Sequence, residues 1–149
     1  MAQGLVSFLE GSGKDSCQRT LDFVVSQDDH YWEHTHDFIQ WLFPLNEVSH
    51  SVRNAPILTD DEIKQLRESE TAQTNIERSV LRYKEFLAGT TNWRSGYDHN
   101  HLRISRVIKC LRLLVSDEEA NAFKYWVAGQ LGDQIDSINA ESKRYWRLA

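Results

Sequence analysis

Residues 98–131 read DHNHLRISRVIKCLRLLVSDEEANAFKYWVAGQL, and this stretch decides the fold class. Its apolar residues return every three or four positions, which is the period of one face of an α-helix. Ser116 and Glu119 divide the stretch, because a Ser followed three residues later by a Glu is the capping box that starts a helix. The sequence therefore predicts one helix over 98–115 and a second helix that ends near Leu131, where two glycines weaken it.

The segments before this pair carry their own helix signals. Thr59 and Glu62 form another capping box, which predicts a helix over 60–68. The next segment, 70–87, has apolar residues at helical spacing and is expected to end at Gly89. Upstream, two aspartates favour a helix start and Pro44 forbids continuation, so one helix is predicted over 29–43.

The remaining segments are less regular. Residues 21–25, LDFVV, are a possible strand, and residues 133–148 are expected to form a last helix with Ile135, Ile138 and Tyr145 as its anchors. The chain has only two prolines and seven glycines and no repeat or linker. We therefore expect an all-α fold: a compact single-domain helical bundle of about five to six helices over residues 1–149, with a lead-in over 1–27 and a tail over 133–149.

The amino-acid composition indicates which classes of binding partner and which cellular compartment to expect. The chain has 22 acidic and 17 Lys or Arg residues, a net charge of −5, whereas nucleic-acid-binding domains are usually basic, so no nucleic acid is expected. The charge is uneven: residues 1–80 carry −8 and residues 81–149 carry +3. Cys17 and Cys110 lack metal-ligand spacing and are expected to be reduced. No transmembrane segment or signal sequence is predicted, which favours a soluble, cytoplasmic protein.

His30, Glu33 and His34 fit the pattern H-x-x-E-H, in which two histidines one helical turn apart bind zinc and the glutamate handles a proton. A hydrolase of this type also needs a third protein ligand, and the sequence singles out none. A solvated helix start is therefore the preferred interpretation, and we expect no metal and no cofactor. A metal-dependent hydrolase remains the less favoured alternative.

Asp98, His99, Asn100 and His101 contain the letters H-N-H, but here they are contiguous and helical, unlike the nuclease motif of that name. With Arg103 and Arg106 on the following turns they could form an anion site, or they could be structural polar residues. Phosphate-binding, nucleophile-elbow and kinase motifs are all missing from the sequence. The aromatic run from Phe38 to Leu45 is interpreted as core, with a groove wall as the alternative.

Residues 36–45, HDFIQWLFPL, closely resemble a signature of the opioid growth factor receptor conserved domain. Residues 99–114, HNHLRISRVIKCLRLL, resemble a second signature of that family, and Asn54-Ala55-Pro56 resembles the loop between them. Together these segments span about residues 30–127. A chain of this length is similar to the stand-alone microbial members, and the animal protein that names the family is reported to bind an enkephalin pentapeptide.

The resemblance directs attention to the polar residues of the two signatures rather than to the histidine pair at 30 and 34. These expected ligand-binding residues are His36, Asp37, Gln40, Trp41, Asn54, His99, Asn100, His101, Arg103 and Arg106. The leading hypothesis is a non-enzymatic binding module for a peptide, a small anionic ligand or a protein partner. The alternatives are an enzyme in which His36 or His101 is the general base, helped by Asp37, and a purely structural network. One of the two arginines is expected to form a buried ion pair with Asp37 or Glu33, and the other to be accessible.

Overall fold

A computed structural model describes residues 4–149, so the first three residues of the expected lead-in lie outside the described part. The chain separates into two compact units, Met1–Phe86 and Leu87–Ala149. Helices account for the regular structure of both units, and between residues 4 and 149 no strand is assigned, only the isolated bridges Leu45–Ile57 and Gly96–Ile138. The predicted all-α class is confirmed.

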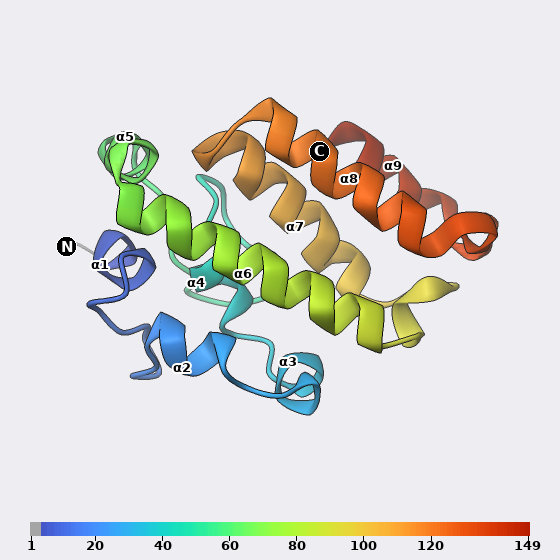
Figure 1. The fold of residues 1–149 in the computed structure, drawn as a ribbon, viewed down its shortest axis with the longest axis horizontal. Helices are drawn as coiled ribbons and strands as arrows, with labels where there is room; N and C mark the ends of the chain where they lie inside the picture. Colours follow the sequence, from blue (N-terminus) through green and yellow to red (C-terminus); the bar gives the residue numbers. More distant parts are fainter. Residues whose placement is uncertain (1–3) are drawn as a thin grey trace. The chain divides into compact units, whose positions relative to one another are not determined.

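The first unit contains six helices among its described residues (Figure 1). They are α1 (Leu5–Leu9), α2 (Leu21–Val25), α3 (Asp29–His34), α4 (Ile39–Leu42), α5 (Asp60–Glu68) and α6 (Glu70–Gly89), the last of which runs past the end of the unit. The predicted capping box of α5 is confirmed, since Thr59 accepts from the Glu62 amide and the Glu62 side chain accepts from the Thr59 amide. Four of these helices have only four to six residues, so the bundle has more helices than periodicity alone reveals.

Two predicted elements of this unit are wrong. The single helix expected over 29–43 is two short helices, because the backbone of Thr35 is extended and α4 begins only at Ile39. The possible strand over 21–25 is helix α2, because the Thr20 hydroxyl accepts from the Phe23 amide and caps it. The predicted stop at Pro44 does hold.

The core of the first unit is aromatic. Trp32 lies 5.0 Å from Phe38 and 6.1 Å from Tyr83, measured between ring centroids, in the range where ring pairs attract. Phe8 packs edge-on against Trp41 at 5.5 Å. The run from Phe38 to Leu45 is buried throughout, as expected for core, so these rings fix the position of the polar residues between them.

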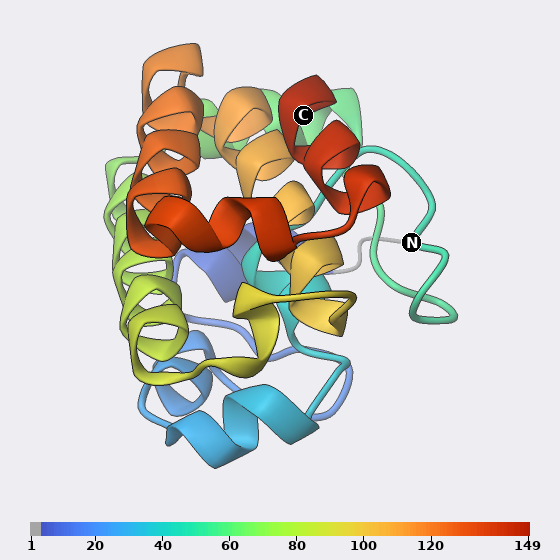
Figure 2. The ribbon, with the colours of Figure 1, turned by 90° about the vertical axis from the view of Figure 1, so that its right-hand side faces the viewer.

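The second unit is built on three helices, α7 (His99–Leu114), α8 (Asp117–Leu131) and α9 (Ala140–Leu148), together with the 3₁₀ turns η1 (Asn92–Arg94) and η2 (Gly132–Ser137). Helix α7 packs against both α8 and α9 (Figure 2). Asp98 and Ser116 cap the starts of α7 and α8, so the predicted boundaries there are confirmed to within a residue.

The tail forms η2 and α9 rather than one continuous helix. Ile138 is buried as expected, but Tyr145 is exposed and Trp146 is the buried anchor of α9. Within residues 4–149, no helix has the length and the apolar character needed to cross a bilayer.

Candidate functional site

The residues expected at a ligand site divide evenly between the two units. Residues 36, 37, 40, 41 and 54 belong to the first unit, and residues 99, 100, 101, 103 and 106 to the second. A ligand site shared by both signatures stays a prediction.

Arg19 organises the polar side chains before α4. Its Nε donates to Asp15 Oδ2 at 2.7 Å, and its Nη1 donates to Asp37 Oδ1 at 2.9 Å and to the Tyr31 hydroxyl at 3.3 Å. The Asp15 side chain is completely buried and also accepts from the amides of Cys17 and Arg19. Arg19 therefore ties the loop before α2 to the segment between α3 and α4.

Asp37 thus has a structural partner within its own unit. Its partial burial would raise its pKa, but the hydrogen bond and the positive charge of Arg19 outweigh that effect, and the pKa of the carboxyl lies below its usual value. Its other oxygen accepts from Cys17 Sγ at 3.4 Å. Sequence reasoning missed Asp15 and Arg19, because neither lies in a motif and their contacts form through loop geometry.

The cysteines show no sign of nucleophilic activation. The hydrogen bond to Asp37 raises the pKa of the Cys17 thiol, with smaller contributions from burial and from the charge of Asp37. Burial raises the pKa of Cys110 to about 12. Both are free cysteines, and a thiol with a raised pKa is a poor nucleophile at neutral pH.

Gln40 lies on α4 within the aromatic core. It is 6% exposed, and among the described residues its side-chain oxygen Oε1 has no hydrogen-bond partner. Burying an unpaired acceptor costs about 1–3 kcal/mol, so such an atom in a folded protein needs an explanation, such as a bound water or a ligand donor. Neighbouring Trp41 is buried and contributes to packing.

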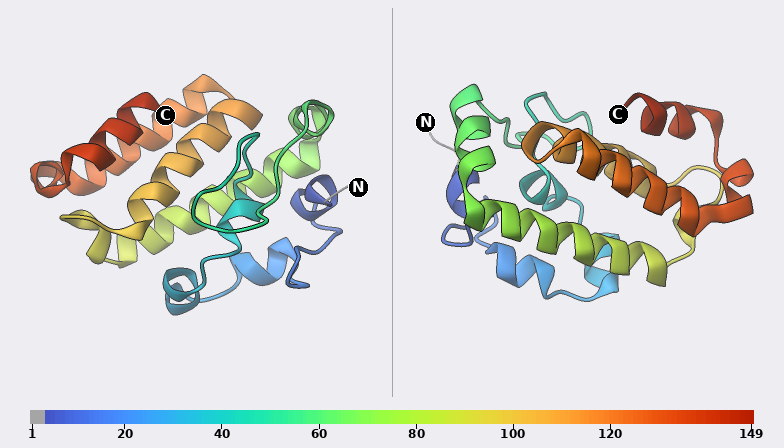
Figure 3. Two further views of the ribbon diagram at one scale, coloured as in Figure 1. Left: turned by 180° about the vertical axis from the view of Figure 1, so that it is seen from behind. Right: turned by 45° about the horizontal axis from the view of Figure 1, so that its top comes forward.

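Asn54 lies on the loop 46–57, which joins α4 to α5 (Figure 3). The loop is closed at its base, where the Leu58 amide donates to the Leu45 carbonyl at 2.8 Å. Asn54 itself adopts a left-handed conformation with φ of 61°, which Asn tolerates better than most residues. The Ser49 hydroxyl accepts from the amides of Ser51 and Val52 and shapes the turn.

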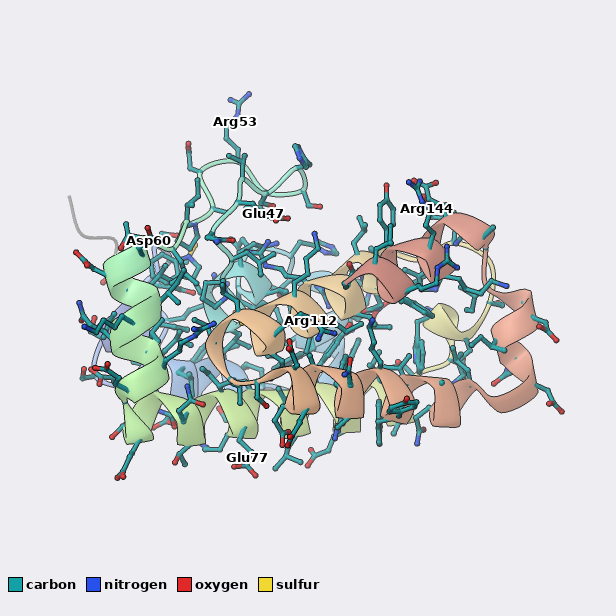
Figure 4. All side chains as sticks on the ribbon, turned by 90° about the horizontal axis from the view of Figure 1, so that it is seen from above. Glu47, Arg53, Asp60, Glu77, Arg112 and Arg144 are labelled. Atoms are coloured by element: carbon teal, nitrogen blue, oxygen red, sulfur yellow. The ribbon has the colours of Figure 1, made fainter. Side chains whose placement is uncertain are left out.

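A pocket of about 630 Å³ opens within this loop. Its walls combine His50, Arg53 and Asn54 with the apolar side chains Val48, Val52 and Ile57. Arg53 projects away from the ribbon at the tip of the loop, where solvent and ligands can reach it (Figure 4). Sequence reasoning selected Asn54 but not His50 or Arg53, because the resemblance covers only the Asn-Ala-Pro part of the loop.

In the second unit, His101 is locked between η1 and α9. Its Nε2 lies 2.7 Å from the Trp93 carbonyl oxygen, which can only accept, so Nε2 carries a proton. Its Nδ1 lies 2.9 Å from Ser142 Oγ, and the His101 carbonyl accepts from Trp146 Nε1 at 2.9 Å. His101 and Ser142 are both almost fully buried.

These hydrogen bonds of His101 argue against the alternative in which His101 is the general base of an enzyme. A general base needs a free nitrogen within reach of its substrate, whereas both ring nitrogens of His101 are occupied inside the protein. Asn139 completes the group, since its Nδ2 donates to Ser142 Oγ and to the Gly96 carbonyl at 2.8 and 2.7 Å. The His101 group therefore holds the start of α9 against the loop before α7.

The other polar residues of α7 differ in burial. Asn100 and Arg103 are buried, and Arg103 Nη1 lies 3.4 Å from Asn100 Oδ1. Arg106 is half-buried, and His99 is exposed next to the capping residue Asp98. Arg103 is therefore the more buried of the two arginines, and the expected ion pair of one of them with Asp37 or Glu33 stays a prediction.

The H-x-x-E-H residues lie on α3, as the pattern requires. The two imidazoles of His30 and His34 are exposed and 4.3 Å apart, and His34 Nδ1 lies 3.0 Å from the His30 carbonyl oxygen. Among residues 4–86, no group of three potential ligand side chains includes this pair. The two histidines are therefore exposed on a short helix, and Glu33 between them is half-buried.

Comparison with known proteins gives one family match. The family model described as the opioid growth factor receptor (OGFr) conserved region matches residues 18–90. This segment contains Arg19 and its partners Tyr31 and Asp37 but not Asp15. It also contains the signature at 36–45 and the loop 46–57, and it ends before the second signature at 99–114.

The similar proteins in the comparison are much longer. Opioid growth factor receptor-like protein 1 of Rattus norvegicus is 34% identical over 99 residues, which cover 53% of this chain and 20% of that protein. The opioid growth factor receptor of Homo sapiens is 31% identical over 113 residues, covering 60% of this chain and 16% of that protein. The chain spans about a fifth of the length of these curated relatives. No solved structure matches it.

Proposed function

We propose that this chain, whose residues 18–90 match the opioid growth factor receptor conserved region, is a non-enzymatic binding module of that family. Its loop 46–57 takes up a short peptide or a small anionic ligand. The chemistry common to both is a carboxylate, which Arg53 and Asn54 recognise at the tip of the loop.

The pocket in this loop is the observation that carries the proposal. Its volume of about 630 Å³ lies in the range of small-ligand sites, which hold roughly 300–1,000 Å³. Arg53 supplies a fork of N–H donors that matches a carboxylate, and Asn54 supplies an amide. Val48, Val52 and Ile57 provide apolar walls for the rest of the ligand.

Binding is favoured over catalysis because the candidate catalytic groups have other partners. Asp37 is held by Arg19, and both nitrogens of His101 contact protein atoms. Asp37, the carboxylate that sequence reasoning assigned as the helper of a His36 base, contacts Arg19 with one oxygen and Cys17 with the other. A cytoplasmic location is part of the proposal and accords with the two free thiols.

Calorimetric titration tests the proposal with an enkephalin pentapeptide, with the same peptide amidated at its C-terminus, and with acetate. We expect the free-acid peptide to bind and the amidated peptide to bind about tenfold more weakly, because a charge-assisted contact to Arg53 is lost. Arg53→Gln should remove this difference. Asn54→Gly should weaken binding while retaining the left-handed backbone that glycine adopts freely.

Lys64→Gln is the matched control, because it makes the same charge change on the exposed surface of α5, outside the loop. It should bind like the parent chain. If the peptides and acetate leave the parent unaffected, or if Arg53→Gln and Lys64→Gln behave alike, the loop is not a carboxylate site.

A further inference from the structure

A second pocket lies entirely within the second unit, and none of the expected ligand-binding residues of the two signatures lines it. It has a volume of about 200 Å³ and is bounded by α7, α8, η2 and α9. Its apolar floor is formed by Ile104 and Ile108 of α7, Val127 and Leu131 of α8, and Trp146 of α9. An engineered apolar cavity of about 150 Å³ binds benzene, so this pocket has room for one ring or a short alkyl chain.

The pocket is held open by contacts between the helices that bound it. Trp146 is fixed by the hydrogen bond from its Nε1 to the His101 carbonyl, and its ring packs edge-on against the His101 ring at 5.3 Å. The end of α9 is held by Arg112, whose Nε donates to the Ala149 carbonyl oxygen at 3.0 Å. Lys124 Nζ on α8 donates to the Arg147 carbonyl on α9 at 3.1 Å. These three contacts set the distance of α9 from α7 and α8, so a ligand would meet a preformed pocket.

All the charged residues that line this pocket are basic: Lys124, Lys143 and Arg147. Their methylene stems add to its apolar walls, and such side chains keep their charged ends toward solvent. Lys143 and Arg147 lie four residues apart on α9 and therefore share a helix face. Burial, and then the charge of Arg112, lower the pKa of Lys124, so its ammonium is incompletely solvated and lies near a like charge. Arg112 is itself paired with Asp117, at 2.9 Å between Nη1 and Oδ1.

From this combination we infer that the pocket of the second unit binds a small hydrophobic carboxylate, with its ring or chain on the Ile104–Val127–Trp146 floor and its carboxylate among Lys124, Lys143 and Arg147. Such a ligand fits both halves of the pocket. Its apolar part leaves water for a site lined by hydrocarbon, and its charge relieves the repulsion between the neighbouring cations. This site shares no lining residue with the pocket of the loop 46–57 and does not depend on the function proposed for that loop.

The test compares three probes of one shape and different charge: 3-phenylpropionate, 3-phenyl-1-propanol and 3-phenylpropylamine. Dissociation constants are measured by calorimetry, and the site is located by NMR shifts of the Trp146 indole N–H and the Ile104 and Val127 amides. We expect the acid to bind about tenfold more tightly than the alcohol, because the ion pair adds a charge-assisted contact. The amine should bind more weakly than either.

Two variants and one control variant test whether the differences in affinity arise from this pocket and from its basic residues. Ala128→Phe fills the pocket from an exposed position on α8 and should abolish binding of all three probes. Lys143→Gln should weaken the acid about tenfold and leave the alcohol unchanged. Arg144→Gln makes the same charge change on the adjacent residue, which is exposed and does not line the pocket, and should change neither affinity.

Three results would overturn the inference. Equal affinities for acid and alcohol, together with no effect of Lys143→Gln, would mean that the site does not select an anion. An absence of binding and of pocket shifts for every probe would mean that it is no ligand site. Dissociation of a dimer on Ala128→Phe, detected by sedimentation, would assign this face to a second copy of the chain.

Discussion

Arg19 in the first unit and His101 in the second unit each join segments that lie far apart along their unit, but they do so with opposite chemistry. Arg19 uses formal charge: one guanidinium contacts a fully buried carboxylate and a half-exposed one. His101 contacts a carbonyl oxygen and a hydroxyl, and both His101 and Ser142 are almost fully buried. The comparison shows that residue types typical of active sites can serve to hold loops in place. It leads to separate predictions for the stability of substituted variants and for the pH dependence of stability.

The largest effect is expected for Arg19→Gln. This change leaves the Asp15 carboxylate buried without its cation, which costs about 3–5 kcal/mol of unfolding free energy. Urea denaturation at pH 7 measures the loss. Arg19→Lys retains the charge but not the fork of donors, and should fall between the parent and Arg19→Gln. A loss below about 1 kcal/mol for Arg19→Gln would show that Asp15 is solvated or finds another donor.

A smaller loss is expected for His101→Leu. The Trp93 carbonyl would lose its donor inside the protein, and an unsatisfied buried group costs about 1–3 kcal/mol. Ser142→Ala should cost less, because it leaves the contact between His101 and Trp93 intact. Denaturation curves of these variants and of Arg19→Gln also test the expected single domain, since in one cooperative domain each variant shifts the same single transition. Equal losses for His101→Leu and Ser142→Ala would contradict the role given to the Trp93 contact.

Asp37 allows a pH test of the charged group. Its pKa in the folded chain lies below its usual value, so it stabilises the fold above the unfolded pKa of about 4, and this contribution disappears as the pH falls through the folded value. Asp37→Asn should therefore lower stability at pH 7 by no more than about 1 kcal/mol, because the carboxylate is half-exposed. Its stability should also fall less steeply than that of the parent below pH 4. Parallel curves for the two chains between pH 2 and pH 7 would rule out this linkage.

The sequence predicts the long, regular helices well, and the reasons are local. The capping residues Thr59 and Ser116 fix the starts of α5 and α8, and the apolar period defines α6 and α7. The prediction of one helix over 29–43 is wrong, because the segment between α3 and α4 contacts a residue that is distant in the sequence. Asp37 accepts a hydrogen bond from Arg19, eighteen positions earlier, and no local sequence pattern predicts that contact.

The candidate sites show the same division between local and distant signals. Asn54 could be predicted as a ligand-binding residue because it belongs to a segment that resembles the family. The neighbouring Arg53 becomes a candidate only when the structure shows a pocket in the loop. The pocket of the second unit is assembled from four elements, and its basic residues are scattered over α8 and α9. A one-dimensional pattern cannot show that Lys124 and Lys143 line the same pocket.

The smallest effect is expected at the H-x-x-E-H residues, which lie beside the Arg19 contacts but share none of the hydrogen bonds of that group. His30 is exposed, and the contact from His34 Nδ1 uses the backbone carbonyl of residue 30, which any substitution keeps. His30→Ala should therefore change the melting temperature by no more than about 1–2 °C, since exposed substitutions usually alter stability by less than about 0.5 kcal/mol.

We also expect the purified chain to carry no stoichiometric zinc, because a catalytic site needs three protein ligands and this pair offers two imidazoles on a six-residue helix. Elemental analysis and thermal unfolding with and without a chelator check both points. One zinc ion per chain that disappears in His30→Ala, together with a chelator-sensitive melting temperature in the parent, would make α3 a metal site and reopen the hydrolase alternative.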